Sequence, residues 1–151
     1  MSLVVVDIDS TVVEEGRLSR FFFRLASFFQ ALGRGRQHPN RVLIEKLNSH
    51  SKVVVLTGRN AKDLEFTKSQ LRKAGLRFDD VICAPRRQII TSWKIDTVRR
   101  LASSGQVVWV DDMFRDRSAK DLASTSGVVL NTPEEFAGSS ARQPQHDFDG
   151  L

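Results

Sequence analysis

Short aliphatic segments alternate with longer amphipathic segments along most of the chain. Five runs rich in valine, isoleucine and leucine predict buried strands, at residues 2–6, 52–56, 80–83, 106–110 and 127–130. Apolar residues at helical spacing predict helices, at residues 19–33, 40–48, 62–74, 92–103 and 118–124. Runs of four or five β-branched residues are typical of parallel strands that are covered on both faces. We therefore expect an α/β fold, a Rossmann-like, doubly wound parallel sheet of about five strands.

The length of 151 residues suits one domain with a core of its own, which we expect to span residues 1–136. From residue 137 the composition shifts to Gly, Ser, Gln, Pro and Asp, which predicts a disordered tail over 137–151. No apolar run approaches the roughly 18 residues of a membrane span, and there is no secretory signal. Cys83 is the single cysteine, so no internal disulfide can form. These features favour a soluble, cytoplasmic protein.

The charge balance favours an anionic partner. Basic residues outnumber acidic ones, 23 to 18, and 16 of the 23 are arginine, which suits bidentate contacts with phosphate. The stretch from Arg17 to Arg41 holds six arginines and no acid. A solvated helix face is still the better explanation for any single arginine in this stretch. Charge alone is therefore weak evidence for DNA or RNA as a partner.

Two pairs of carboxylates follow two of the predicted strands. Asp7 and Asp9 come after 2–6, and Asp111 and Asp112 come after 106–110. Ligands gather beyond the carboxyl ends of such strands, where these groups would repel one another unless a cation neutralised them. Oxygen ligands without Cys or His favour Mg²⁺. One such aspartate is best explained as a turn former, but two pairs predict a metal site.

The same edge of the sheet offers the groups that phosphoryl transfer needs. Asp7 and Asp9 lie two residues apart, so an extended backbone would point both carboxylates the same way. One carboxylate can attack phosphorus while the other carries the proton. Thr57, Gly58 and Arg59 follow the second strand and predict a phosphate cradle of hydroxyl and backbone N–H groups. Lys94 would hold the nucleophile ionised, although by itself it would be taken for a surface lysine.

Four segments resemble, in order, the four motifs of the haloacid dehalogenase-like phosphohydrolases: Asp7-Ile8-Asp9-Ser10-Thr11, Val55-Leu56-Thr57-Gly58-Arg59, Lys94 and Val110-Asp111-Asp112. The resemblance covers about residues 2–131 and implies a Mg²⁺-dependent phosphatase. It implies that Asp7 forms an aspartyl-phosphate and that Asp9 is the general acid/base, with its backbone carbonyl on the metal. It also implies that Thr57 grips the phosphoryl group, that Lys94 supplies the cation, and that Asp111 and Asp112 complete the metal site.

Two positions depart from the family pattern. Ser10 stands where the family usually has glycine, which changes the local backbone but removes no catalytic group. Asp116 follows Asp112 after a three-residue gap, which leaves open which acid binds the metal. We expect Asp111 to bind it directly and Asp112 to act in the second shell or through water.

The segment between the first two motifs is short, so the resemblance implies a minimal cap. Residues 14–39 leave room for a flap and one Phe-rich helix, and the site is expected to be open. The phenylalanines and Leu25 of that helix either pack into the core, which is the better explanation, or cover the site. A second subunit is the other candidate cover, although nothing in the sequence indicates an oligomer.

Within the family, the chain most resembles the phosphatase domains of bacteriophage polynucleotide kinase-phosphatases and RNA-repair proteins. The residues that carry this likeness are Thr57-Gly58-Arg59, 71–79, Pro85, Trp93-Lys94 and Val110-Asp111-Asp112. Arg59 matches an arginine of that group, and Gly16-Arg17 matches a second one only when one residue is dropped. The implied activity is removal of a terminal 3′-phosphate from DNA or RNA, with Ser10, Thr11, Arg17, Gly58 and Arg59 binding the substrate. The alternatives are a phosphatase of a small metabolite, such as a nucleotide or sugar phosphate, and a binding module without turnover.

Overall fold

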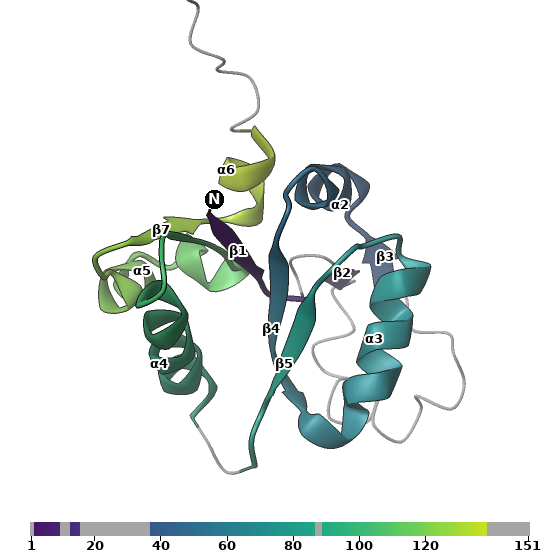
Figure 1. The fold of residues 1–151 in the computed structure, drawn as a ribbon, viewed down its shortest axis with the longest axis horizontal. Helices are drawn as coiled ribbons and strands as arrows, with labels where there is room; N and C mark the ends of the chain where they lie inside the picture. The colour runs from purple at the N-terminus through teal and green to yellow at the C-terminus, as the bar shows by residue number, and fades with distance from the viewer. Residues whose placement is uncertain (1, 10–12, 16–36, 87–88, 139–151) are drawn as a thin grey trace, which may run out of the picture.

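The computed structural model describes residues 2–9, 13–15, 37–86 and 89–138 (Figure 1). Its main feature is a parallel sheet of five strands in the order β5-β4-β1-β6-β7. The strands are β1 (Leu3–Val6), β4 (Val53–Asn60), β5 (Asp80–Ala84), β6 (Val107–Val110) and β7 (Val128–Asn131). The chain adds strands on one side of β1 and then returns to add strands on the other side. The expected α/β fold with a doubly wound parallel sheet is thus confirmed.

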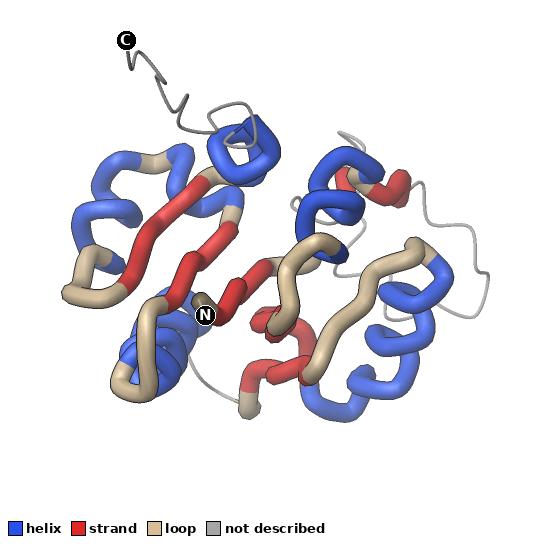
Figure 2. The backbone as a smooth tube through the Cα atoms, turned by 45° about the horizontal axis from the view of Figure 1, so that its top comes forward, coloured by secondary structure: helices blue, strands red, loops and turns tan. Residues whose placement is uncertain are grey.

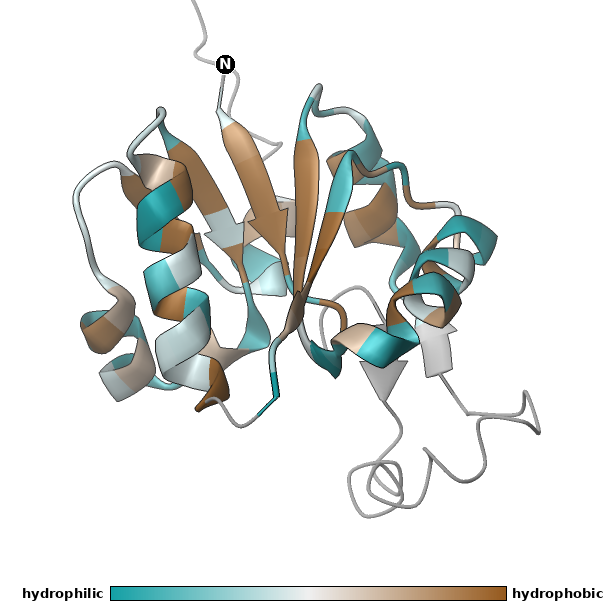
Figure 3. Cartoon of the chain, turned by 60° about the horizontal axis from the view of Figure 1, so that its bottom comes forward, coloured by the Kyte–Doolittle hydropathy of each residue, from teal (hydrophilic) through white to brown (hydrophobic). Residues whose placement is uncertain are grey.

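Helices cover both faces of this sheet. They are α2 (Arg41–Asn48), α3 (Leu64–Lys73), α4 (Ile90–Ala102), α5 (Arg117–Ala123) and α6 (Pro133–Gly138), with 3₁₀ turns η2 (Ala61–Asp63) and η3 (Asp112–Arg115). The core residues of α2, α3 and α6 pack on one face. Those of α4 and α5 pack on the other. Figure 2 shows the strands between the helices, and Figure 3 shows that these strands are largely apolar.

The three valines of β1 explain why both faces must be covered. Val4 and Val6 pack against α2 and α3, whereas Val5 packs against α4. All three are fully buried. Successive side chains of a strand point to opposite faces, so an uninterrupted aliphatic run needs a helix layer on each side. This arrangement places the carboxyl end of β1 at the centre of the sheet edge.

Two features of the fold depart from the sequence-based expectation. Strand β4 continues to Asn60, beyond the expected end at residue 56, and its pairing with β5 is irregular between Thr57 and Asn60. A small antiparallel ribbon joins β2 (Val13–Glu15) and β3 (Gln37–Pro39) within the segment expected to form the flap. Neither feature has the alternating apolar pattern that signals a strand.

Helix α6 was also not predicted, although its start carries a recognisable signal. The Thr132 hydroxyl accepts a hydrogen bond of 3.2 Å from the backbone N–H of Glu135, and Pro133 is the first helical residue. A threonine cap followed by proline is typical of a helix N-terminus. Phe136 then attaches this short helix to the core.

Some expectations fall on residues that the structure does not describe. The helix over 19–33, the substrate residues Ser10, Thr11 and Arg17, and the tail from residue 139 onward lie outside the described residues. Among the helices that are described, none combines the length and apolar character required to cross a bilayer.

Candidate active site

The sheet brings Asp7 and Asp111 together because they follow the last paired residues of two neighbouring strands. Val6 of β1 is in register with Val110 of β6, and the backbone N–H of Asp7 donates a 3.0 Å hydrogen bond to the carbonyl of Val110. Asp112 is the next residue, at the start of η3. One carboxylate oxygen from each of Asp7, Asp111 and Asp112 lies within 4.8 Å of the other two. The expected convergence of carboxylates thus involves three of the four residues.

Lys94 enters the carboxylate group from helix α4. Its Nζ lies 3.0 Å from Oδ1 of Asp7 and 2.8 Å from Oδ2 of Asp111. The lysine is only 6% exposed, so it is not a surface residue. The neighbouring side chains Trp93 and Ile95 are in the core, which fixes this turn of the helix against the sheet. Two buried ion pairs therefore join α4 to the ends of β1 and β6.

The electrostatics of this group leave negative charge in excess. Burial and the nearby charge of Asp111 raise the pKa of Asp7 well above its usual range, although Lys94 acts in the opposite direction. Burial, a hydrogen bond with Asp111 and the charge of Asp111 raise the pKa of Asp112 to about 6. Burial lowers the pKa of Lys94, but Asp7 and Asp111 outweigh that effect and raise it. One lysine is therefore not enough to neutralise three carboxylates.

The donor set fits a hard divalent cation. The three nearest ligand groups are carboxylates, and the described residues place no His or Cys among them. Both oxygens of Asp111 already accept hydrogen bonds, Oδ2 from Lys94 at 2.8 Å and Oδ1 from the backbone N–H of Met113 at 3.1 Å. A carboxylate oxygen has a second lone pair, so these bonds orient Asp111 without preventing metal binding. The expected order, with Asp111 bound to the metal directly and Asp112 acting behind it or through water, stays a prediction.

Asp9 makes a separate ion pair with Arg59. Nη2 of Arg59 lies 2.7 Å from Oδ1 of Asp9, and Nε lies 3.2 Å from Oδ2, so both carboxylate oxygens are engaged. Strand β1 ends at Val6 and the chain turns at Ile8, so strand alternation no longer determines where Asp9 points. The carboxylate of Asp9 is therefore not part of the three-carboxylate group. The resemblance assigns its backbone carbonyl to the metal, and that assignment stays a prediction.

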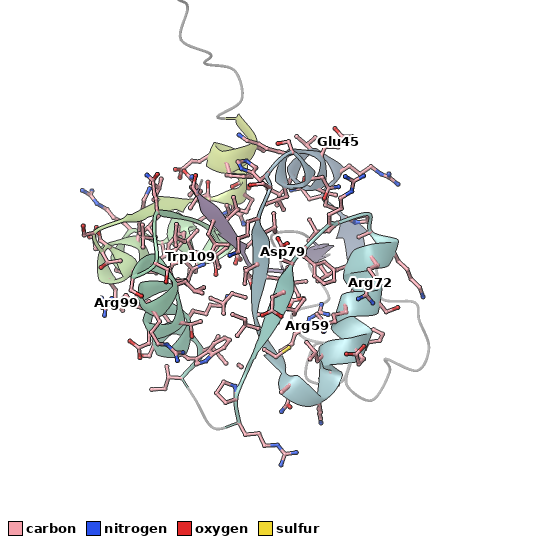
Figure 4. All side chains as sticks on the ribbon, viewed as in Figure 1. Glu45, Arg59, Arg72, Asp79, Arg99 and Trp109 are labelled. Carbon is pink, nitrogen blue, oxygen red and sulfur yellow. The ribbon has the colours of Figure 1, made fainter. Side chains whose placement is uncertain are left out.

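Helix α3 holds Arg59 from the other side. Nη1 of Arg59 donates to Oε1 of Gln70 at 2.6 Å and to the hydroxyl of Thr67 at 3.5 Å. Figure 4 shows Arg59 between the sheet and α3, on the opposite side of the sheet from Trp109. Thr67 and Gln70 were not singled out from the sequence. The available sequence signal was the spacing of Thr67, which lies three residues after Leu64 and four before Leu71 and so shares their face of the helix.

Thr57 ends the buried part of β4 beside these groups. Its hydroxyl oxygen accepts a 3.1 Å hydrogen bond from the backbone N–H of Arg59 and keeps one hydrogen to donate. Thr57 is fully buried, whereas Gly58 is exposed. The irregular end of β4 therefore combines an oriented hydroxyl with accessible backbone, as a phosphate cradle requires.

The structure thus places most of the expected site at one edge of the sheet. Asp7, Lys94, Asp111 and Asp112 form one group, and Asp9, Arg59 and Gln70 form a second.

Comparison with models of protein families and with curated protein sequences finds no match for this chain.

Proposed function

We propose that this protein is a Mg²⁺-dependent phosphomonoesterase in which Asp7 is the nucleophile. The observation that carries the proposal is the position of the Lys94 ammonium, 3.0 Å from Asp7 and 2.8 Å from Asp111, at the end of the central strand. The Lys94 ammonium favours the ionised form of Asp7, which is the form that can attack phosphorus, although burial and Asp111 act in the opposite direction. The ordered motifs at Asp7, Thr57, Lys94 and Asp111 support the same activity.

In the first step, a carboxylate oxygen of Asp7 attacks the phosphorus atom of the ester. A bond between phosphorus and Asp7 forms while the bond between phosphorus and the leaving oxygen breaks. The carboxyl group of Asp9 gives its proton to the departing oxygen, which leaves as an alcohol. Lys94 holds Asp7 in position, and the Thr57 hydroxyl donates to a phosphoryl oxygen.

In the second step, water attacks the phosphorus atom of the aspartyl-phosphate. Asp9, now a carboxylate, takes a proton from this water. The bond between phosphorus and Asp7 breaks, which releases inorganic phosphate and restores the Asp7 carboxylate. The same residue thus serves as acid and then as base.

The residues that would hold Mg²⁺ are Asp7, Asp111 and Asp112, with the backbone carbonyl of Asp9. When bound there, Mg²⁺ neutralises charge on the carboxylates and the phosphoryl oxygens. The raised pKa values of Asp7 and Asp112 support this assignment, because burial and Asp111 disfavour the ionised forms of both groups and a bound cation would offset these effects.

Arg59 has two anionic partners in this scheme. In the free protein its N–H groups bind Asp9, Gln70 and Thr67. A phosphate that reaches the Thr57 turn competes with Asp9 for Arg59. Substrate binding then loosens the ion pair, and the freed Asp9 carboxylate takes up a proton from solvent, which it gives to the leaving oxygen in the first step.

The substrate class we favour is a nucleic acid with a terminal 3′-phosphate. The net charge of +5 and the likeness to end-processing phosphatases support it. A phosphatase of small metabolites is the alternative, because the same catalytic groups serve any phosphomonoester.

Phosphate release from a panel of esters tests this proposal. The panel holds 3′- and 5′-phosphorylated oligonucleotides, a sugar phosphate and nitrophenyl phosphate, each with Mg²⁺ and with a chelator. We expect Mg²⁺-dependent release that is lost in Asp7→Asn and kept in Asp96→Asn, since Asp96 is an exposed residue of α4. Fastest release from the 3′ end supports the nucleic-acid substrate, and release from small esters alone supports the alternative. No release from any ester would overturn the proposed function.

A further inference from the structure

A cavity of about 420 Å³ opens beside the proposed phosphate cradle. It lies at the carboxyl ends of β4 and β5 and at the start of α4. Its lining includes two cations, one amide and an apolar wall: Lys62, Arg86, Asn60, Gly58, Pro85 and Ile90. We call it the basic pocket. The mechanism above uses none of these side chains.

The basic pocket is next to the catalytic groups along the chain. Gly58 directly follows Thr57, so their Cα atoms are about 3.8 Å apart. Ile90 precedes Lys94 by four residues in α4, so both side chains lie on one face of the helix, about one turn apart. A Cβ atom on Gly58 would lie 3.0 Å from Cγ2 of Ile90, which shows that these two walls touch. The pocket is therefore within reach of a molecule whose phosphate sits at Thr57 and Lys94.

The charge of the basic pocket favours an anion. Lys62 and Arg86 are both exposed, and none of the lining residues is acidic. In the described part of the chain, neither cation forms an ion pair with a carboxylate. The side chain of Asn60 accepts a 3.0 Å hydrogen bond from the backbone N–H of Lys62, which fixes the start of η2 at the pocket wall. These features suit a phosphate group better than a neutral ligand.

Part of the lining of the basic pocket is apolar and accessible. Ile90 is 38% exposed, and Pro85 is also exposed. Apolar surface in the same pocket as two cations suits a ligand that has both a flat or aliphatic body and a negative charge, such as a nucleoside with a phosphate.

We propose that the basic pocket binds a second phosphate of the substrate, together with the nucleoside that carries it. The proposal rests on the proposed function, because it assumes that the first phosphate is bound at Asp7 and Thr57. The second phosphate can come from the backbone of an oligonucleotide or from a nucleoside bisphosphate. The shared chemistry is a nucleoside that bears two phosphate groups.

The test compares substrates that differ in their number of phosphates. They are a nucleoside 3′-monophosphate, a nucleoside 3′,5′-bisphosphate, a 3′-phosphorylated oligonucleotide and nitrophenyl phosphate, all with Mg²⁺. The variant is Lys62→Ala/Arg86→Ala. The matched control is Lys73→Ala/Arg77→Ala, which removes the same charge at two exposed residues away from the pocket.

We expect the pocket variant to lose about tenfold or more in kcat/KM for the bisphosphate and the oligonucleotide. We expect changes of no more than about twofold for nitrophenyl phosphate and the nucleoside monophosphate, and for the control variant with every substrate. A loss confined to the oligonucleotide supports the proposal and identifies a chain end as the source. Equal losses for all four substrates, or no loss for any, would overturn it.

Binding measurements separate failure of this proposal from failure of the proposed function. The Asp7→Asn protein is titrated with the nucleoside bisphosphate by calorimetry, with and without the pocket substitutions. Binding that the pocket substitutions weaken about tenfold supports the basic pocket even if the native protein releases no phosphate. Binding that they leave unchanged would overturn it even if the native protein is an active phosphatase.

Discussion

Arg59 binds both oxygens of Asp9, with Nη2–Oδ1 and Nε–Oδ2 distances of 2.7 and 3.2 Å. This ion pair connects the segment after β1 to the end of β4. Gln70 and Thr67 of α3 accept hydrogen bonds from Nη1 of the same arginine, which holds the guanidinium in place. The position of the proposed acid/base is therefore set by a helix on one face of the sheet, whereas the nucleophile is held by Lys94 from the other face.

The Arg59–Asp9 pair predicts a dependence on the leaving group. In Asp9→Asn, we expect the rate of the first step to fall about 10²–10⁴-fold with alkyl phosphates, because the departing alkoxide then receives no proton. Nitrophenolate leaves without a proton, so the first step with nitrophenyl phosphate slows much less, although Asp9 serves the second step with both esters. Rapid-quench measurement of leaving-group release in the first turnover gives the comparison.

Gln70→Leu tests whether α3 positions this acid/base. Loss of a short hydrogen bond to Arg59 is expected to lower the rate of the first step with alkyl phosphates about tenfold, with a smaller effect on the first step with nitrophenyl phosphate. Lys73→Leu, at an exposed position of the same helix, is the control. Equal losses on both esters in Gln70→Leu would mean that Gln70 acts on stability alone.

The substitutions Lys94→Met and Asp7→Asn are predicted to change the free energy of unfolding in opposite directions. Lys94→Met leaves two buried carboxylates without their cation and is expected to lower the free energy of unfolding by about 3–5 kcal/mol. In Asp7→Asn, the cost of keeping a buried negative charge disappears. Its pKa is raised in the folded protein, so this cost grows as pH rises above the ordinary value of 3.8. Urea unfolding at pH 7.5 without Mg²⁺ should therefore show a more stable Asp7→Asn protein. A destabilised Asp7→Asn protein, with Asp96→Asn unchanged, would contradict this prediction.

Mg²⁺ is predicted to stabilise the protein more at pH 7.5 than at pH 5.5. The pKa of Asp112 is raised to about 6, so at the lower pH a proton competes with the metal for this carboxylate. At pH 7.5 the carboxylate is ionised and available. Thermal unfolding with and without Mg²⁺ measures the difference, which should shrink in Asp112→Asn. A shift in Tm that does not depend on pH would contradict the assigned ligand set.

Helix α6 is predicted to contribute to stability without contributing to the chemistry. Phe136 is 3% exposed, its ring lies 4.7 Å from the Nζ of Lys46, and its carbonyl accepts a hydrogen bond from the same ammonium. The His50 ring packs against it at 5.4 Å. Phe136→Ala should lower the free energy of unfolding by about 3–5 kcal/mol. Turnover measured well below the Tm should stay close to native, and a selective loss of turnover would contradict this assignment.

The features that the sequence predicted well are those that follow from short patterns. The valine run of β1 predicted a parallel strand covered on both faces, and the position of Asp111 after β6 predicted its meeting with Asp7, because neighbouring parallel strands end at the same edge. The partner of Asp9 could not be predicted. The pair with Arg59 depends on a turn at Ile8 and on the packing of α3, neither of which has a local signal.

The hydrophobic pattern also did not predict the ribbon of β2 and β3 or the short helix α6. Each has only a few residues, so hydrophobic periodicity carries little information there. The basic pocket has the same origin, because it depends on the contact between Gly58 and Ile90, which lie 32 residues apart in the sequence. Tertiary packing, rather than local preference, creates these features.

The most direct test of the central claim is to trap phosphate on Asp7. The native protein is mixed with a phosphate-labelled ester and Mg²⁺, quenched in acid within a single turnover, and digested for mass spectrometry. We predict an acid-stable, alkali-labile label on the peptide that contains Asp7, absent from Asp7→Asn and present in Asp96→Asn. Turnover of the ester with no label on Asp7, or with the label on another residue, would contradict the assignment of Asp7 as the nucleophile.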